Sequence, residues 1–177
     1  MTVAPHGPQL ILAELTGVFA RVQPGQIDEL ARSIRRAGRV VCAGQGRSGL
    51  VAAALAVRLL HLGADAHVAG EATCPAIGEP DLLIALSRSG TTGVTVHQAR
   101  RARAARAHVA VITVHPDSPL GDLAELTIAV PDSTSRQHAG SLFEQAALVI
   151  ADSVSATLQT VTGQDDATLS SRHDNLQ

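Results

Sequence analysis

The stretch Ser87-Arg88-Ser89-Gly90-Thr91-Thr92 decides the fold, because it lies where a strand is expected to give way to a helix. Before it, Asp81-Leu82-Leu83-Ile84-Ala85-Leu86 is a short apolar block that predicts a buried strand. After it, residues 93–106 predict a helix that is basic toward its end. The first turn of a helix attracts anions, because it presents free backbone N–H groups and the positive end of the helix dipole.

Hydroxyl side chains are concentrated at this turn. Ser87, Ser89, Thr91 and Thr92 supply the hydroxyls, and Arg88 adds a guanidinium that matches phosphate oxygens. A serine or threonine that caps the helix is the ordinary alternative, but a cap needs only one such residue. We therefore interpret residues 87–92 as a cradle for a phosphate group.

Strands and helices alternate on both sides of the cradle. Strands are expected at 39–43, 64–69, 81–86, 108–114 and 126–130, and helices at 9–22, 26–37, 50–62, 93–106, 120–123 and 140–161, with a further helical turn or two in 165–177. This alternation predicts a parallel sheet with helices on both faces. In such sheets, ligands bind outside the carboxyl ends of the strands. The turn Gly44-Gln45-Gly46-Arg47-Ser48-Gly49 follows the first strand, so it is expected to share one crevice with the cradle.

Composition narrows the class of protein. The chain has 177 residues, 45% hydrophobic and 17% charged, which predicts one globular domain. We expect N-terminal helices over 9–37, a sheet core over 39–130, and a C-terminal helix and tail over 140–177. Phe19 and Phe143 are the only aromatic residues and the formal net charge is −2, so nucleic-acid binding is disfavoured. The core must consist of alanine, valine, leucine and isoleucine.

Two cysteines, Cys42 and Cys74, have the spacing of neither a zinc site nor a disulfide framework, and are expected to be small buried hydrophobes. The first eight residues do not resemble a signal peptide, and no apolar run approaches the ~20 residues that span a bilayer. These features predict a cytoplasmic protein without a membrane partner.

The pattern Gly44-x-Gly46-x-x-Gly49 is also the dinucleotide-binding fingerprint, and Glu71 could serve as the acid that binds a ribose. This alternative predicts a nicotinamide enzyme. It leaves the hydroxyls of residues 87–92 unexplained, and the chain has little room for a separate catalytic domain. A small ligand with one phosphate and a polyol tail uses both turns better.

Glu144 opens the last predicted helix within a run of apolar residues, and it could act as a base toward a carbon acid. A glutamate in a first helical turn can also merely complement the helix dipole. Of the histidines, His61 ends a predicted buried helix. His173 lies in the polar tail, where a histidine is incidental unless the tail packs across a neighbouring subunit's site.

Together these segments resemble one family, 6-phospho-3-hexuloisomerase of the sugar isomerase (SIS) domain superfamily. The segments that carry the resemblance are Gly44-Gln-Gly-Arg-Ser-Gly-Leu50, Arg58-Leu-Leu-His-Leu-Gly63, Pro75-Ala-Ile-Gly78, Asp81-Leu-Leu-Ile-Ala85, Pro116-Asp-Ser118, Gly140-Ser-Leu-Phe-Glu-Gln145 and Arg172-His-Asp-Asn-Leu176. The resemblance implies a five-stranded parallel sheet in a three-layer α/β/α sandwich and a homotetramer. It also implies interconversion of D-arabino-hex-3-ulose 6-phosphate and fructose 6-phosphate in formaldehyde fixation by the ribulose monophosphate pathway, without a metal or organic cofactor.

The resemblance also assigns roles by position. The hydroxyls that hold the sugar phosphate match Ser48, Ser87, Ser89 and Thr92, and the same two turns add Gly46, Arg47, Arg88 and Thr91 to the expected substrate-binding residues. The acid/base groups match Glu144 and His173, with His173 reaching an adjacent subunit, and His61 matches a motif position that we count as catalytic.

One departure from the family pattern concerns the cradle, which usually reads Ser-Gly-Ser-Gly-Glu-Thr. Here Arg88 and Thr91 replace the inner glycine and the glutamate. One alternative is a SIS module that only senses a sugar phosphate. A second alternative is an isomerase of another phosphosugar, because specificity for the sugar depends on the shape of the pocket.

Overall fold

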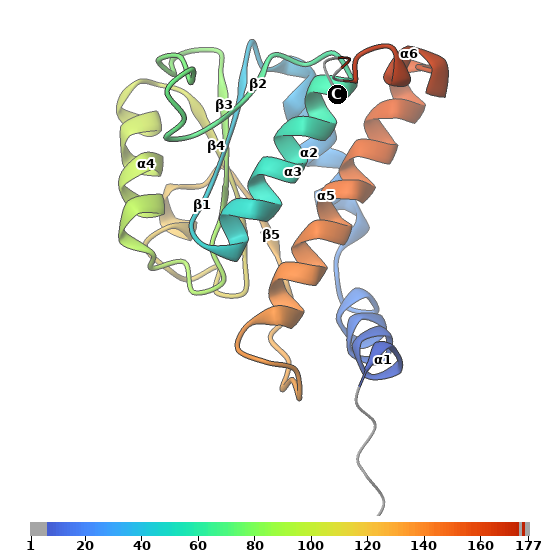
Figure 1. The fold of residues 1–177 in the computed structure, drawn as a ribbon. Coiled ribbons are helices and arrows are strands. Elements are labelled where there is room, and N and C mark those ends of the chain that lie inside the picture. The colour runs from blue at the N-terminus through green and yellow to red at the C-terminus, as the bar shows by residue number, and fades with distance from the viewer. Residues whose placement is uncertain (1–6, 174, 176–177) are drawn as a thin grey trace, which may run out of the picture.

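In a computed structural model, which describes residues 7–173 and residue 175, strands and helices alternate as predicted (Figure 1). The elements are α1 (Pro8–Phe19), α2 (Pro24–Arg36), β1 (Val40–Gly44), α3 (Arg47–His61), β2 (Ala66–Val68), β3 (Leu82–Leu86), α4 (Gly93–Ala104), β4 (His108–Thr113), the 3-10 turn η1 (Gly121–Leu123), β5 (Leu126–Ala129), α5 (Ser141–Thr162) and α6 (Asp166–Ser170). Residues 1–6, 174, 176 and 177 of the expected domain lie outside the described residues.

The strands form one sheet in the order β2-β1-β3-β4-β5, and every neighbouring pair is parallel. This confirms the predicted five-stranded parallel sheet. The chain moves outward from β1 to β2, then returns to place β3 on the other side of β1. The strand order therefore reverses between β1 and β3, and ligands in open parallel sheets bind beside such a reversal.

Helices cover both faces of the sheet, unequally (Figure 1). The cluster that includes Val40 and Ile84 packs against α2, α3 and α5, and it includes the fully buried Val18 of α1. The opposite cluster, which includes Val41 and Ala85, packs against α4 alone among the long helices. The sheet thus lies between two helical layers, and its core consists of small aliphatic side chains, as the near absence of aromatic residues predicts.

Helix α3 buries one face, along which its buried apolar residues recur at helical spacing. Val51, Leu55 and Leu59 are buried in the core shared by β1 and α5. Leu50 and Val57, however, are 72% and 50% exposed. The expectation that this helix is buried on more than one side is wrong for the single chain, because the apolar residues outside the buried face are exposed.

Several boundaries differ from the prediction. α3 begins at Arg47 rather than at residue 50, so Arg47 and Ser48 are first-turn residues of this helix. α1 ends at Phe19, three residues before the predicted end at residue 22.

The two cysteines differ in burial. Cys42 is fully buried, and burial raises the pKa of its thiol to about 12, whereas Cys74 is only half-buried. Among the described helices, none has the length and apolar character needed to cross a membrane.

Candidate active site

The two turns that the sequence singled out are neighbours at the carboxyl edge of the sheet. β1 and β3 pair along their whole length, from Val40 with Leu82 to Gly44 with Leu86. The chain that leaves β1 therefore enters α3 beside the chain that leaves β3 and enters α4. The prediction that both turns share one edge at the reversal of strand order is confirmed.

The cradle, residues 87–92, has a conformation that depends on Gly90. This glycine has φ +65°, and a Cβ on it would lie 2.0 Å from Ser118 Oγ. The Gly90 carbonyl accepts a hydrogen bond from the Leu120 N–H at 3.0 Å. The Val114 N–H donates to the Arg88 carbonyl at 3.2 Å. The loop after β4 therefore holds the cradle against the sheet edge.

The cradle hydroxyls are joined to one another in two pairs. Ser87 Oγ and Thr92 Oγ1 lie 3.0 Å apart. Thr91 Oγ1 donates to Ser89 Oγ at 2.9 Å, and the Thr91 N–H donates to the same oxygen at 3.2 Å. Ser87 is buried, so the pairing satisfies its hydroxyl away from water. These contacts fix the hydroxyls in place before any ligand arrives.

The start of α4 is not capped by a side chain. Thr92 occupies the N-cap position, but its side chain makes no capping hydrogen bond and contacts Ser87 instead. The first N–H groups of a helix have no partner within the helix, so those of α4 stay available to an anion. The ordinary capping alternative therefore does not account for this threonine.

Arg88 lies on the outer side of the cradle and is exposed. Its guanidinium is 3.9 Å from the Asp132 carboxylate. Its Cδ lies 3.8 Å from the position that a Cβ on Gly140 would occupy. The arginine thus connects the cradle with the residues that lead into α5.

Arg47 and Glu144 form an ion pair between the first turns of α3 and α5. The Glu144 side chain is 15% exposed and the Arg47 side chain 63%. The apolar neighbours of Glu144 in the sequence indicated an apolar setting, but the fold places a guanidinium against the carboxylate. Ser48, half-buried, and Gly46, the N-cap of α3, lie beside this pair.

His61 and His173 do not meet Glu144 within one chain. Their rings stack with centroids 3.7 Å apart at the far end of α3, which lies about 20 Å from Arg47 at 1.5 Å per residue. Burial, followed by the proximity of His173 and Arg58, lowers the pKa of His61 below its ordinary value of 6.5. The single chain brings the two histidines together, but apart from the crevice.

Sequence reasoning missed the segment that follows β5. Residues 131–138 were predicted only as a polar loop, and we call residues 131–140 the β5–α5 loop. They line a cavity of about 410 Å³ together with Arg88, Val18 and the start of α5. The consecutive hydroxyls of Ser133, Thr134 and Ser135 at the end of a parallel strand were the signal that could have identified it.

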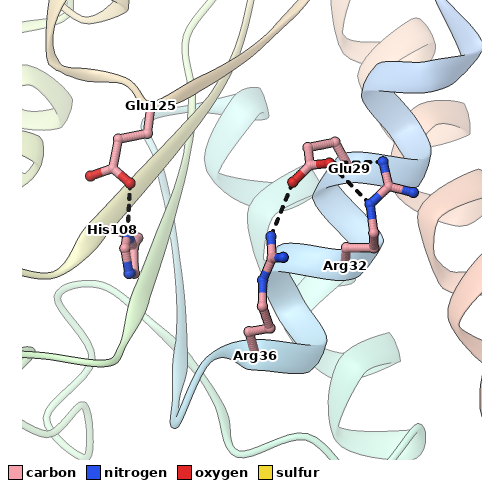
Figure 2. A network of polar contacts seen from close by, with 5 residues as sticks. All are labelled: Glu29, Arg32, Arg36, His108 and Glu125. Carbon is pink, nitrogen blue, oxygen red and sulfur yellow. Dashed lines mark hydrogen bonds and ion pairs between the residues drawn. The ribbon is translucent and has the colours of Figure 1, made fainter.

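A second charged cavity, of about 290 Å³, lies at the opposite, amino-terminal edge of the sheet. Figure 2 shows its charges: Glu29 contacts Arg32 and Arg36, and His108 lies 2.5 Å from Glu125. These charges satisfy one another and lie far from the cradle. Among the described residues, no three histidine, cysteine, aspartate or glutamate side chains gather to hold a metal ion.

Comparison with known proteins identifies the relatives of this chain. The SIS domain family model matches residues 33–158. A 3-hexulose-6-phosphate isomerase of Mycobacterium gastri is 43% identical over 176 residues, covering 95% of this chain and 88% of that protein. One of Bacillus subtilis is 38% identical, covering 94% and 95%. A solved structure from Methanococcus jannaschii, described as inferring the same molecular function, has a TM-score of 0.86 at 28% identity and covers 96% of this chain and 98% of that one.

Proposed function

Because this chain belongs to the SIS domain family and its full-length relatives include 3-hexulose-6-phosphate isomerases, we propose that it interconverts D-arabino-hex-3-ulose 6-phosphate and fructose 6-phosphate. This is the activity of the 6-phospho-3-hexuloisomerase family that the sequence resembles. SIS domains bind sugar phosphates. The observation that carries the assignment is the uncapped start of α4, ringed by paired hydroxyls, at the same sheet edge as Glu144. The family match does not favour the nicotinamide alternative.

In the proposed complex the phosphate binds at the cradle. Ser87, Ser89 and Thr92 direct hydroxyls toward it, the first N–H groups of α4 donate to its oxygens, and Arg88 adds a positive charge at the rim. The phosphate does not react, but the free energy of binding it holds the sugar carbons in the orientation needed for proton transfer. This orientation lowers the activation barrier.

Glu144 is the proposed base. It removes the proton from C2 of the hex-3-ulose, the C3 carbonyl oxygen takes up a proton, and a 2,3-enediol forms. Glu144 then returns its proton to C3 while the C2 hydroxyl loses one, which gives the C2 carbonyl of fructose 6-phosphate. Arg47 orients the carboxylate and stabilises negative charge that develops on the oxygens. Acid/base groups of this kind contribute about 10²–10⁴-fold to the rate.

His173 enters this proposal through a second copy of the chain. In a homotetramer the tail would carry it to a neighbouring crevice, where it would move protons between the two oxygens or open the furanose ring. His61, stacked on it, would orient its ring. Exposed Leu50 and Val57 of α3, with Leu148 of α5, form an apolar surface that supports self-association.

A binding-only role is favoured by one observation, the threonine at position 91 where the family usually has glutamate. Four points stay predictions: the sensing alternative, the specificity for this sugar over other phosphosugars, the independence of metals and cofactors, and the cytoplasmic placement. The ribulose monophosphate pathway would supply the substrate from formaldehyde.

A coupled assay tests the proposal. Hexulose 6-phosphate is generated in the assay mixture from formaldehyde and ribulose 5-phosphate. The fructose 6-phosphate that forms is measured through coupled reactions that produce NADPH, with EDTA present. Turnover by the wild type, lost in Glu144→Gln, supports the isomerase. A wild type without turnover, whose melting temperature still rises with fructose 6-phosphate, overturns it in favour of the sensor.

A further inference from the structure

The β5–α5 loop forms a wall between the cradle and the start of the helix that carries Glu144. Ser133 and Thr134 line the cavity of about 410 Å³, and so do Arg88 of the cradle and Leu142 of α5. Gly140, at the end of the loop, is the N-cap of α5 with φ +85°. The position of this loop therefore determines both the width of the cavity and the direction in which α5 begins.

The sheet does not hold this loop. The last backbone hydrogen bond to the sheet before the loop is donated by the Val130 N–H to the Thr113 carbonyl at 2.8 Å. The next backbone hydrogen bond along the chain is donated by the Ser141 N–H to the His138 carbonyl at 3.0 Å. Within the described part of the chain, no backbone–backbone hydrogen bond involves residues 131–137. Since polar backbone groups need partners, other contacts must define this conformation.

Glu14 of α1 supplies most of these contacts. Its carboxylate accepts hydrogen bonds from Ser135 Oγ at 2.7 Å, the Arg136 N–H at 2.8 Å and Gln137 Nε2 at 2.9 Å. The Arg136 N–H, followed by Ser135 and Gln137, lowers the pKa of Glu14 below its ordinary value. One ionised carboxylate thus holds three consecutive residues of the loop.

Arg21, seven residues further on, holds the other end of the loop. Its guanidinium donates to the Asp132 carbonyl at 3.3 Å and contacts Ser133 Oγ. Glu14 within α1 and Arg21 just beyond its end therefore contact the loop at two points.

We infer that Glu14 is a positioning residue of the proposed isomerase: through Ser135, Arg136 and Gln137 it fixes the hydroxyl-bearing wall along which the sugar chain of the substrate lies. The inference rests on the proposed function. Glu14 does not touch the phosphate site, so its effect is confined to the sugar end of the ligand and to the placement of α5.

The test compares a ligand that reaches the wall with one that does not. In Glu14→Ala, the KM for hexulose 6-phosphate and the Kd for fructose 6-phosphate should each rise about tenfold, because hydrogen bonds to the charged group are lost. The Kd for inorganic phosphate, which needs only the cradle, should stay within about twofold. Adding Ser135→Ala should cause little further change, because both substitutions break the same contact.

Glu29→Ala is the matched control. Glu29 is also a partly exposed helical carboxylate with several donors, Arg32 and Arg36 (Figure 2), but it lies at the amino-terminal edge of the sheet. Its substitution should leave all three constants unchanged. Glu14→Asp, which keeps the charge on a shorter arm, should recover part of the loss.

Two outcomes overturn the inference alone, and a third overturns the proposed function on which the inference rests. If Glu14→Ala lowers only the melting temperature, its role is structural. If it weakens phosphate and fructose 6-phosphate equally, it acts on the cradle rather than on the wall. If the wild type neither turns over hexulose 6-phosphate nor binds fructose 6-phosphate, the proposed function fails, and the inference that rests on it fails with it.

Discussion

Gly90→Ala is the substitution with the largest effect that the structure predicts on the cradle. A residue with a side chain pays about 1–2 kcal/mol for the left-handed conformation that Gly90 adopts at φ +65°. The added Cβ would lie 2.0 Å from Ser118 Oγ and 2.6 Å from Ser118 Cβ. Relief of such an overlap within packed groups costs about 1–3 kcal/mol. The free energy of unfolding should therefore fall by about 2–5 kcal/mol.

For a chain of this length, each kcal/mol changes the melting temperature by about 2–4 °C, so Gly90→Ala should lower it by about 4–20 °C. A thermal scan monitored by dye fluorescence or circular dichroism measures this shift. The same variant should raise the KM for the sugar phosphate, because Gly90 lies between Ser89 and Thr91 and sets the direction of both hydroxyls.

Two further variants separate the causes. Gly17→Ala lies inside α1, where a Cβ would meet no atom within 4 Å, and it should stabilise the protein by about 0.5–1 kcal/mol. Adding Ser118→Gly to Gly90→Ala removes the overlap and should recover most of the steric part, leaving the backbone cost. A Gly90→Ala protein that melts within 2 °C of the wild type and keeps its KM would refute the reasoning, and so would a double variant that recovers nothing.

Three other predictions test the site. Glu144→Gln should lower kcat by about 10²–10⁴-fold with little change in KM, and an unchanged kcat in steady-state assays would exclude Glu144 as the base. Ser87→Ala and Thr92→Val should each raise KM about tenfold, and less than multiplicatively when combined, since the hydroxyls are 3.0 Å apart; a fully multiplicative effect would contradict the pairing. The pKa of His61 is lower in the folded chain than its ordinary value of 6.5. As the pH drops, the imidazole is therefore protonated in the unfolded chain at a higher pH than in the folded chain. The free energy of unfolding should fall as the pH drops through 6.5. The difference in melting temperature between pH 7.5 and 5.5 should shrink in His61→Phe, which keeps a stacking partner for His173, and an equal difference in both proteins would count against this source of pH dependence.

Local sequence was sufficient for the sheet and the cradle. The apolar block before Ser87 has the length of a buried strand and ends at a turn signal, and the small hydroxyl residues after it match the turn into α4. Both signals act between residues close in the chain, because strand and helix periodicity and helix-end chemistry are local properties. Boundaries shifted by up to three residues where a helical first turn, such as that of Arg47, lacks a side-chain cap to mark it.

The sequence alone thus determined the alternation of strands and helices and the parallel sheet, and it predicted an anion site between β3 and α4. Tertiary structure decided the rest. The ion pair of Arg47 with Glu144 joins residues 97 positions apart, and the contact of Glu14 with Ser135 joins residues 121 apart. No local pattern encodes such pairs, because they depend on the order in which the strands assemble and on how α1 and α5 pack over them. The same packing separates His61 and His173 from the crevice of their own chain.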